Sequence, residues 1–423
     1  MNKYFLLFLF IFCTLFANAQ NNNSPYTIIG IGDIENGSLD RTAGMGNASI
    51  AVWSKRNLIQ SNPASFARLE DVPFRTGFNF EVSARYNSVN YAGTPVTNAS
   101  DNRSTDLQFK KACLAVKPKK YWAISLGLVP YSTANYSFGL NKDVPGAGFT
   151  IPSYIQGSGN TSLIYLANSF AINKHLSFGV QTAAIFGQFS QVETIASAQV
   201  SDSVLFSTRN YSVNAPFFKF GVLYDHDINK KWNVALGSTL SLKTQLNGLY
   251  DLTVINGNST IKSNETYVSN YFTIPVAYAG GVSATYSQKY TIAADYGYQP
   301  WSNTNPSGLG YKIINSNHFS VGGEYANRMI FRDGTSVEKY FLQAGFYYNN
   351  SYLQIYGNQI TDVGGTIGAG FNSLKNGLGM SAALQIGSRG TMSQNLIKEN
   401  YIRLSVTISY RDFWRAQNKY KYD

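Results

Sequence analysis

From Phe74 onward, apolar side chains recur at nearly every second position, and this alternation limits what the chain can fold into. The segments 121–128, 232–240 and 401–410 show it most clearly, with large apolar residues on one face and smaller or polar residues between them. A period of two with one apolar face is typical of a half-buried β-strand. No segment of comparable length has a convincing helical period, so the sequence predicts an all-β fold.

Turn residues divide this region into about fourteen predicted strands, an even number, as single-chain bacterial barrels have. Gly, Asn, Pro and Lys mark the divisions. The predicted strands are 74–92, 105–117, 120–139, 160–173, 175–195, 209–226, 231–252, 265–286, 289–301, 316–327, 338–350, 359–372, 376–388 and 398–411. The barrel is therefore expected over 74–411, followed by a periplasmic C-terminal tail, 412–423.

The predicted connections alternate between short turns and long polar loops. Short turns fall at 117–120, 173–174, 227–230 and 287–289, and long loops at 140–159, 196–208, 253–264 and 302–315. The connection 328–337 breaks this alternation, because it is long where a short turn is expected. Outer-membrane barrels have short periplasmic turns and long external loops. We therefore predict a transmembrane antiparallel β-barrel in the outer membrane of a Gram-negative bacterium, in contact with lipid and lipopolysaccharide.

The composition agrees with a wall that has one face in lipid and one in water. Charged residues make up only 13% of the chain, against about 25% in typical soluble proteins. There are 30 Tyr, 27 Phe and 37 Gly residues. The formal net charge is +11, but the Lys and Arg residues are scattered, many of them in short turns. Nucleic-acid binding needs a clustered basic patch, so no nucleic-acid partner is expected.

The first nineteen residues are expected to be a cleaved signal peptide. Lys3 supplies the positive start, residues 4–16 form an apolar run, and Ala17-Asn18-Ala19 fits a small-x-small cleavage site. The run is too short to be expected as a permanent membrane helix. Removal of this segment takes Cys13 with it and leaves Cys113 as the single cysteine, which excludes an intramolecular disulfide.

Between the signal and the strands lies a segment, 20–73, without sustained alternation. It is rich in glycine, which permits tight turns and close approach to neighbouring backbone. Asn62 precedes Pro63, which favours extended or turn geometry at that point. A structureless leader of this length is unusual unless it has a role or is disordered. Two interpretations stay open, a flexible periplasmic tail and a folded hatch that plugs the barrel.

The same segment carries a resemblance to a known family. The pattern Arg41-x-x-Gly44-x-Gly46-x-Ala48, followed by Asn62-Pro63-Ala64 and a first strand near Phe74, resembles the hatch of the FadL/TodX outer-membrane transporters. The stretches 387–391, 396–401 and 412–414 also look like members of that family. The resemblance implies a fourteen-stranded barrel with an N-terminal hatch that includes these seven residues. It further implies a route by which an apolar ligand passes the hatch and leaves through a gap in the wall.

Pro130 lies inside the third predicted strand, where proline removes one ladder hydrogen-bond donor. Within the resemblance it is a candidate lateral outlet. A local bulge without a role in transport is an equal alternative, because bulges are common at barrel rims. Pro275 in the eighth predicted strand is open to the same two interpretations. Ligand-binding residues cannot be selected from the sequence, since the strand register decides which side chains face inward.

The sequence shows no pattern that indicates catalysis. His175, His226 and His318 have no partners at metal-ligand spacing, and Asp225 and Asp227 beside His226 are expected in a short, solvated turn. There is no Gly-x-Ser-x-Gly elbow and no Walker loop. We expect no metal, no cofactor and no enzymatic activity.

Three functional hypotheses follow. The first is passive uptake of hydrophobic small molecules, such as long-chain fatty acids, through a hatch-plugged barrel, which would shield an apolar solute from the polar lipopolysaccharide layer. The second is a FadL-like accessory barrel with protein partners in a larger outer-membrane complex, such as a secretion or assembly machine. The third, a barrel enzyme, would need a nucleophile and a base clustered at the outer rim. Ligand identity and oligomeric state are left open by the sequence.

Overall fold

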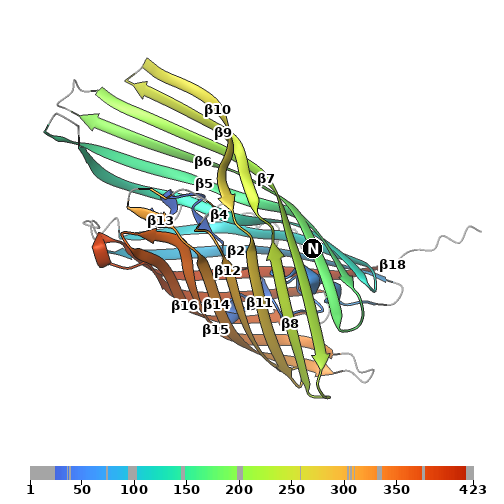
Figure 1. Ribbon diagram of the computed structural model, residues 1–423. Coiled ribbons are helices and arrows are strands. Elements are labelled where there is room, and N and C mark those ends of the chain that lie inside the picture. The colour runs from blue at the N-terminus through green and yellow to red at the C-terminus, as the bar shows by residue number, and fades with distance from the viewer. Residues whose placement is uncertain are drawn as a thin grey trace, which may run out of the picture.

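The computed structural model describes residues 24–35, 37, 40–72, 75–93, 102–143, 148–197, 203–257, 259–302, 304, 307–308, 310–330, 336–373 and 377–415. The predicted signal peptide and residues 416–423 of the predicted tail lie outside these ranges. Among the described residues, no helix has the length and apolar character needed to cross a membrane. Eighteen strands joined in one sheet make up almost all of the described chain (Figure 1).

The strands follow one another around the wall as antiparallel neighbours. Their bounds are β1 (Asp33–Ile34), β2 (Arg75–Ala92), β3 (Arg103–Lys119), β4 (Trp122–Asp143), β5 (Thr150–Ala171), β6 (Leu176–Ser197), β7 (Ser203–Asp227), β8 (Trp232–Ser241), β9 (Thr244–Asn256), β10 (Ser259–Ile274), β11 (Ala277–Tyr286), β12 (Tyr290–Gln299), β13 (Tyr311–Ile313), β14 (Ser316–Ile330), β15 (Ser336–Ile355), β16 (Asn358–Asn372), β17 (Leu378–Arg389) and β18 (Lys398–Arg415). Strand β18 pairs with β2 from Lys398 opposite Ala92 to Arg415 opposite Arg75, which closes the barrel.

The wall of the described barrel contains fourteen strands. Strand β1 belongs to the N-terminal segment, and β13 is a three-residue strand beside β15. Strands β8 and β9 are one wall strand interrupted at 242–243, and β10 and β11 are one wall strand interrupted at 275–276. The second interruption falls at Pro275, which has no N–H to donate to a neighbouring strand. The predicted closed, antiparallel, fourteen-stranded barrel is therefore confirmed.

All fourteen predicted strands coincide with a wall strand, but several begin or end elsewhere. The largest difference is β5, which begins at Thr150 instead of 160. Most of the predicted loops 140–159, 196–208 and 253–264 belong to tall hairpins whose strands rise beyond the rest of the wall (Figure 1). Strand β10 is exposed on both faces from Ser259 to Tyr267. Because both faces lie in water there, the pairing needs no apolar alternation, and the sequence signal disappears.

Three smaller expectations were also wrong. Strands β14 and β15 pair as far as Ile330 opposite Ser336, so the supposedly long connection 328–337 is largely a hairpin. Strand β18 continues to Arg415, so the first residues of the predicted tail, 412–415, belong to the wall. Asp225, His226 and Asp227 end strand β7 and do not form a turn.

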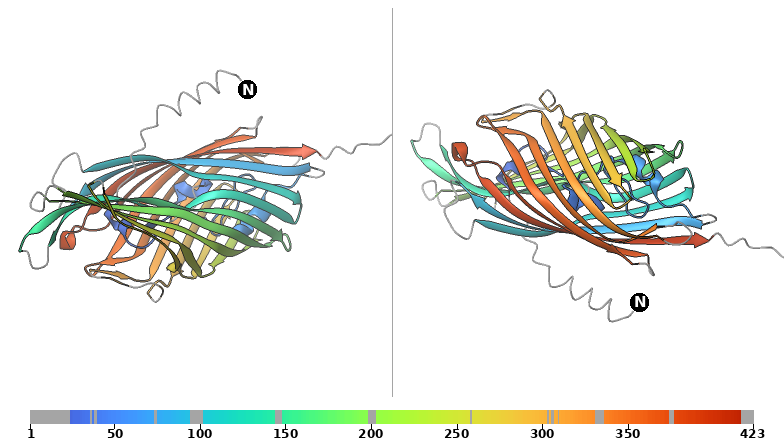
Figure 2. Two further views of the ribbon diagram at one scale, coloured as in Figure 1. Left: turned by 90° about the horizontal axis from the view of Figure 1, so that it is seen from above. Right: turned by 90° about the horizontal axis from the view of Figure 1, so that it is seen from below.

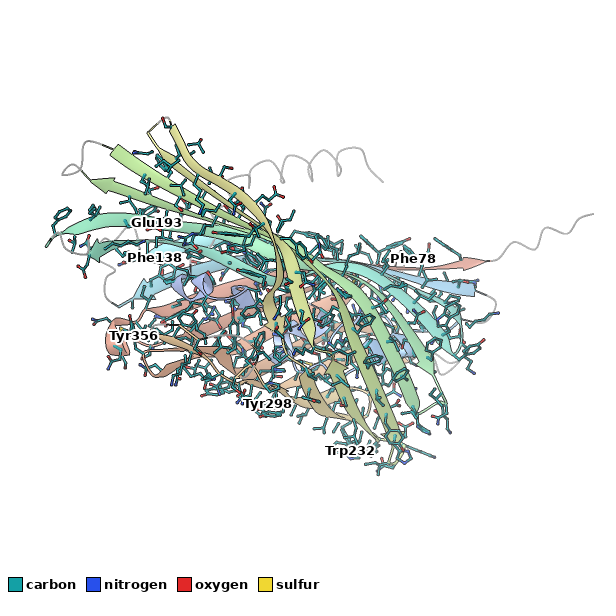
Figure 3. All side chains as sticks on the ribbon, turned by 45° about the horizontal axis from the view of Figure 1, so that its top comes forward. Phe78, Phe138, Glu193, Trp232, Tyr298 and Tyr356 are labelled. Carbon is teal, nitrogen blue, oxygen red and sulfur yellow. The ribbon has the colours of Figure 1, made fainter. Side chains whose placement is uncertain are left out.

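The outer face of the wall is apolar and the inner face is small or polar. Along β18, for example, Ile402, Leu404 and Ile408 are exposed, whereas Ser405 and Thr407 are buried inside. Aromatic pairs lie at the end with short turns, including Phe78 with Trp414 and Trp232 with Tyr286. Figure 3 shows Phe78 and Trp232 at this end, and Phe138 and Glu193 at the opposite, tall end. An apolar outer band with interfacial aromatic residues is the architecture of outer-membrane barrels.

Candidate functional site: the hatch and the wall around it

Residues 24–72 enter the barrel and form the hatch, which lies inside the wall in both views of Figure 2. Three short 3₁₀ helices shape it: η1 (Pro25–Ile28), η2 (Arg41–Met45) and η3 (Pro63–Arg68). Short polar residues cap the second and third helices at their N-termini. The Asp40 carboxylate accepts from Thr42 N at 2.8 Å, and Asn62 Oδ1 accepts from Ala64 N at 3.0 Å. The third helix also has Pro63 at its first position, where no N–H is needed.

Arg41 anchors η2 to the wall through two carboxylates. Its guanidinium bonds Glu324 of β14 at 2.5 and 3.1 Å, pairs with Glu338 of β15, and lies 4.2 Å above the ring of Phe341. Burial by itself opposes the charge, but the carboxylates of Glu324 and Glu338 hold the pKa of Arg41 above its ordinary value. Gln343 Nε2 donates to the Glu324 carboxylate at 2.7 Å, which fixes that acceptor further. This is a buried charge network between hatch and barrel.

Next to this network, hatch backbone packs directly on wall backbone. Six inward positions on β6, β7, β8, β14, β15 and β16 are glycines at which an added Cβ would come closer than 3.0 Å to hatch atoms. We call these residues the glycine belt: Gly179, Gly221, Gly237, Gly322, Gly345 and Gly368. The register places them at one level, since Gly179 pairs with Gly221 and Gly322 with Gly345. The hatch also has glycines at this contact. A Cβ added at Gly44 would meet Gly368, and Gly46 has a φ of +66°.

Wall side chains also satisfy the polar backbone of the hatch. The Asp295 carboxylate accepts from Ser49 N at 2.5 Å and Ile50 N at 2.8 Å. The Thr366 hydroxyl accepts from Gly46 N and donates to the Gly44 carbonyl, both at 2.8 Å. Buried backbone groups without such partners would be costly. The hatch is therefore bonded into the wall and does not simply rest in the lumen.

The Asn-Pro-Ala element makes a similar set of bonds on the other half of the belt. Asn62 Nδ2 donates to the carbonyls of Ile50 and Val222, each at 2.9 Å. Ala64 is fully buried and packs with Leu223 and Ala235 of the wall. Lys117 Nζ then donates to the carbonyls of Ala67 and Leu69 at 2.7 and 2.6 Å, closing the end of η3.

The wall is interrupted between β3 and β4. These strands pair only between Ala112 opposite Leu128 and Lys119 opposite Trp122. Beyond Leu128, β3 still pairs with β2 as far as Arg103, and β4 still pairs with β5 as far as Asp143. We call the stretch where no ladder joins β3 (103–111) to β4 (129–143) the seam. Pro130 stands at its lower end, where the β4–β5 register also slips between Pro130 and Ser132.

The first part of the hatch, residues 24–35, covers one edge of the seam from inside, and we call it the strap. Its strand β1 pairs with β4 through Asp33 opposite Thr133 and Ile34 opposite Ser132. Glu35 N donates to the Tyr131 carbonyl at 2.9 Å, and Ser24 N donates to the Asn135 carbonyl at 2.7 Å. The edge of β4 thus takes its partner from the hatch instead of from β3.

Charges hold the strap across the seam. The Glu35 carboxylate accepts from Arg85 at 2.6 and 3.0 Å and from Lys110 Nζ at 2.8 Å, which joins it to β2 and β3. Burial alone would raise the pKa of Glu35, but the two cations lower it below its ordinary range. A register shift on β3 leaves Lys110 as an extra residue, so that it faces inward together with Lys111. Arg389 of β17 binds Asp33 at 2.7 Å.

A cavity of about 400 Å³ lies between the strap, the hatch residues from Gly46 to Ile50 and the upper wall. Its lining includes eleven ionisable side chains of Asp, Glu, Lys and Arg among the described residues: Asp33, Glu35, Arg85, Lys110, Lys111, Lys219, Asp295, Asp362, Arg389, Glu399 and Arg403. A second hollow of about 450 Å³ lies on the wall beside Phe109, Leu128 and Pro130. The two hollows share Gln108, Lys110 and Pro130, among other residues, so the interior opens at the seam.

The seven hatch residues selected from the sequence all lie buried inside the barrel: Arg41, Gly44, Gly46, Ala48, Asn62, Pro63 and Ala64. They lie in or just after η2 and at the start of η3, and they do not converge on one ligand site. Pro130 lies apart from them, at the seam. The sequence reasoning missed Glu324, Glu338 and Asp295 and all of the glycine belt. Glycines within alternating strands were the one available signal, since they often mark a close approach of backbone.

Within the described residues, no group of three or more His, Cys, Asp or Glu side chains is placed to hold a metal ion. The rings of His175 and His226 lie 5.4 Å apart, and His175 Nδ1 is 2.8 Å from the Asp225 carbonyl oxygen. Cys113 is buried against Tyr165 and neighbouring apolar residues.

The fold is that of several solved channels. A FadL homologue of Pseudomonas aeruginosa is 14% identical over 87% of this chain and 97% of its own, with a TM-score of 0.58. The toluene transporter TodX of Pseudomonas putida is 15% identical over 90% and 99% of the two chains, with a TM-score of 0.57. The monoaromatic hydrocarbon channel CymD is 15% identical over 92% and 100%, with a TM-score of 0.57. At this identity the likeness shows the fold alone.

Sequence comparison assigns the family. No curated protein matches the chain. The model of the BamG family matches residues 1–421, which is nearly the whole sequence. The chain is therefore a FadL-like outer-membrane barrel that belongs to the BamG family.

Proposed function

We propose that this barrel is an accessory subunit of a larger outer-membrane protein complex, of the kind that secretes or assembles proteins. The observation that carries the proposal is the way the hatch is held. It is bonded to the wall through the glycine belt, the Arg41 network and the Asp295 carboxylate. A plug that moves aside for each ligand would have to break several buried charge-assisted bonds together.

The cavity supports the same proposal. A channel for hydrophobic molecules needs a predominantly apolar surface with few polar groups. Here ion pairs such as Glu35 with Lys110 and Asp33 with Arg389 face the cavity. An apolar ligand would remove water from these charges without replacing their hydrogen bonds. The family name is also that of a Bam protein and not of a transporter.

The tall hairpins give such a subunit a surface for partners. Strands β5, β6, β7, β9 and β10 extend as a sheet beyond the rim formed by the other strands (Figure 1). The outer part of β10 is exposed from Ser259 to Tyr267. A water-exposed sheet of this size serves protein contact better than it serves passage of a small apolar solute.

Purification from native membranes tests the proposal. The chain, tagged at its C-terminus at the natural locus, should be extracted in mild detergent as part of a stable complex with defined protein partners. Size-exclusion chromatography and quantitative mass spectrometry should give a constant partner ratio across the peak. A chain that elutes alone, with a lipid or detergent tail occupying its cavity, would overturn the proposal.

Passive uptake of hydrophobic molecules is the second candidate. It is favoured by the seam, which joins the cavity to the outer wall at Pro130, and by the fold it shares with hydrocarbon channels. Uptake of labelled long-chain fatty acids by cells with and without the gene tests it. Uptake that falls severalfold on deletion and returns with the gene would favour the channel, whereas equal uptake would rule out fatty acids as the cargo.

A further inference from the structure

Among the described residues, no strand pairs with the β3 edge of the seam, and the strap pairs with the β4 edge only near residues 131–135. The strap pairs with the β4 side, as Asp33 opposite Thr133 shows, and no ladder joins it to β3. On β3 the edge next to the hollow is formed by Leu107, Gln108, Phe109 and Lys110, of which the last three line it. Backbone groups on such an edge are a template for an added strand.

The level of the seam determines which molecules can satisfy this edge. Leu107 pairs with Tyr86 of β2, which pairs with Leu404 of β18, and all three side chains are exposed on the outer face. This part of β3 therefore belongs to the apolar outer band. A lipid tail there offers no hydrogen bond, and an unsatisfied backbone group in hydrocarbon is strongly unfavourable. A polypeptide strand supplies both donors and acceptors.

The strap already shows how an extended segment is received at this place. It pairs with the edge of β4 and puts a carboxylate, Glu35, on Lys110 of β3. The hollow outside the strap has apolar walls at Phe109, Leu128 and Pro130. These walls suit the alternate side chains of a second extended segment, which would lie next to β3 and continue the existing interface between hatch and wall.

A free edge elsewhere in the described wall, on β10, is less suitable. Strand β10 pairs only with β9, but its register shifts between Thr260 and Lys262 and again between Val268 and Phe272. Its exposed part also carries Lys262 and Glu265. Bulges and charges of this kind protect an edge against pairing. On β3 the ladder with β2 is regular from Arg103 to Phe109, and Leu107 and Phe109 are exposed.

We propose that the seam is an acceptor site for one extended segment of a partner protein, which adds a strand to β3 alongside Leu107–Phe109. The proposal rests on the proposed function, because it names where the complex is joined. The partner segment is expected to carry apolar side chains toward Phe109, Leu128 and Pro130.

Hydrogen exchange measured by mass spectrometry tests this. The native complex is compared with the chain alone in detergent and with the chain alone in nanodiscs of native lipids. We expect peptides covering 105–111 to exchange at least about tenfold more slowly in the complex, as backbone pairing protects amides. Peptides covering 259–268 of β10 should exchange equally in all three samples.

Photo-crosslinking locates the partner segment relative to β3. A benzophenone side chain at Leu107 should crosslink to one contiguous partner peptide, the same peptide that becomes protected in the complex. The matched control at Leu236, an outward residue of β8 with 51% of its surface exposed, should not. Slow exchange of 105–111 in nanodiscs without a partner would overturn the seam proposal, because lipid or another copy would then cover the edge.

The remaining outcomes separate the two proposals. A stable complex in which 105–111 exchanges as in the free chain would overturn the seam site and leave the accessory function standing. Absence of any complex would overturn the accessory function, and the seam site with it.

Discussion

The two sides of the hatch are held in opposite ways. On the belt side, η2 and η3 touch the wall backbone to backbone, through glycines such as Gly322 and Gly345. On the seam side, the strap touches the wall through one short ladder and through charges that also face the cavity. Close packing admits little adjustment, whereas charges beside water can be rearranged at small cost. The part of the hatch that packs on the belt is therefore fixed, and the seam is where the wall can accept a segment of a partner protein.

The largest effect is expected from Arg41→Met, which removes the cation between Glu324 and Glu338. Breaking one partner of a buried pair leaves uncompensated charge and typically costs about 3–5 kcal/mol. We expect a large fall in the urea midpoint of unfolding. The midpoint is measured from the heat-modifiable mobility of the barrel on semi-native gels. Adding Glu324→Gln and Glu338→Gln to Arg41→Met should recover part of the loss. An unchanged midpoint in the single variant would show that the hatch is not held by this network.

A smaller but still clear effect is expected from Gly322→Ala, because the new methyl group would overlap the carbonyl and Cβ of Met45. Overpacking of this kind costs about 1–3 kcal/mol. Gly323→Ala is the matched control, since its Cβ would come no closer than 3.8 Å to Thr291 O. Equal thermal midpoints for the two variants would contradict the close packing of the belt.

Asn62→Ala should cost about 0.5–2 kcal/mol, the usual range for loss of a helix-capping side chain. It removes the acceptor for Ala64 N and the donor to the Ile50 and Val222 carbonyls. Limited proteolysis should then cut the hatch near residue 62 while the wall stays intact. Ser61→Ala serves as the neighbouring control, and hatch cleavage at the same rate in both would refute the role assigned to Asn62.

The smallest effect on global stability is expected from Glu35→Gln, because its partners Arg85 and Lys110 also line the cavity and water can replace the lost carboxylate. We expect a loss of about 1 kcal/mol, because glutamine keeps one acceptor for the two cations and the cavity admits water to the other, together with faster hydrogen exchange in the strap. A loss of unfolding free energy as large as that of Arg41→Met would contradict the proposed difference between the belt side and the seam side of the hatch.

The strap should also stay in place when the pH is lowered from about 8 to about 5. A carboxylate with a lowered pKa contributes stability above its unfolded value, about 4.3 for Glu, and loses it only as the pH falls through the lower folded value. Exchange of the strap should therefore be equal at about pH 5 and about pH 8 once corrected for the intrinsic rate. Release of the strap near pH 5 would contradict the lowered pKa of Glu35.

Much of the wall could be predicted because the alternation of residues along each strand distinguishes the outer face from the inner face. Segment 398–411 alternates strongly, and β18 follows it closely. The prediction failed where both faces are wet, as at Ser259–Tyr267 of β10, and where polar pairing replaces apolar contrast, as at the start of β5. In the hatch, Asn62-Pro63-Ala64 was selected through its resemblance to the FadL/TodX hatch, and the capping role of Asn62 appears only in the structure.

The sequence by itself determined a barrel of about fourteen strands preceded by a glycine-rich segment without alternation, because alternation and turns act over a few neighbouring residues. Only the tertiary structure decided what holds the hatch and where the wall is open. Gly322 meets Met45, and Arg41 meets Glu324, across 277 and 283 positions of sequence. Contacts so distant depend on register and barrel closure, in which a shift of one residue exchanges the inner and outer faces.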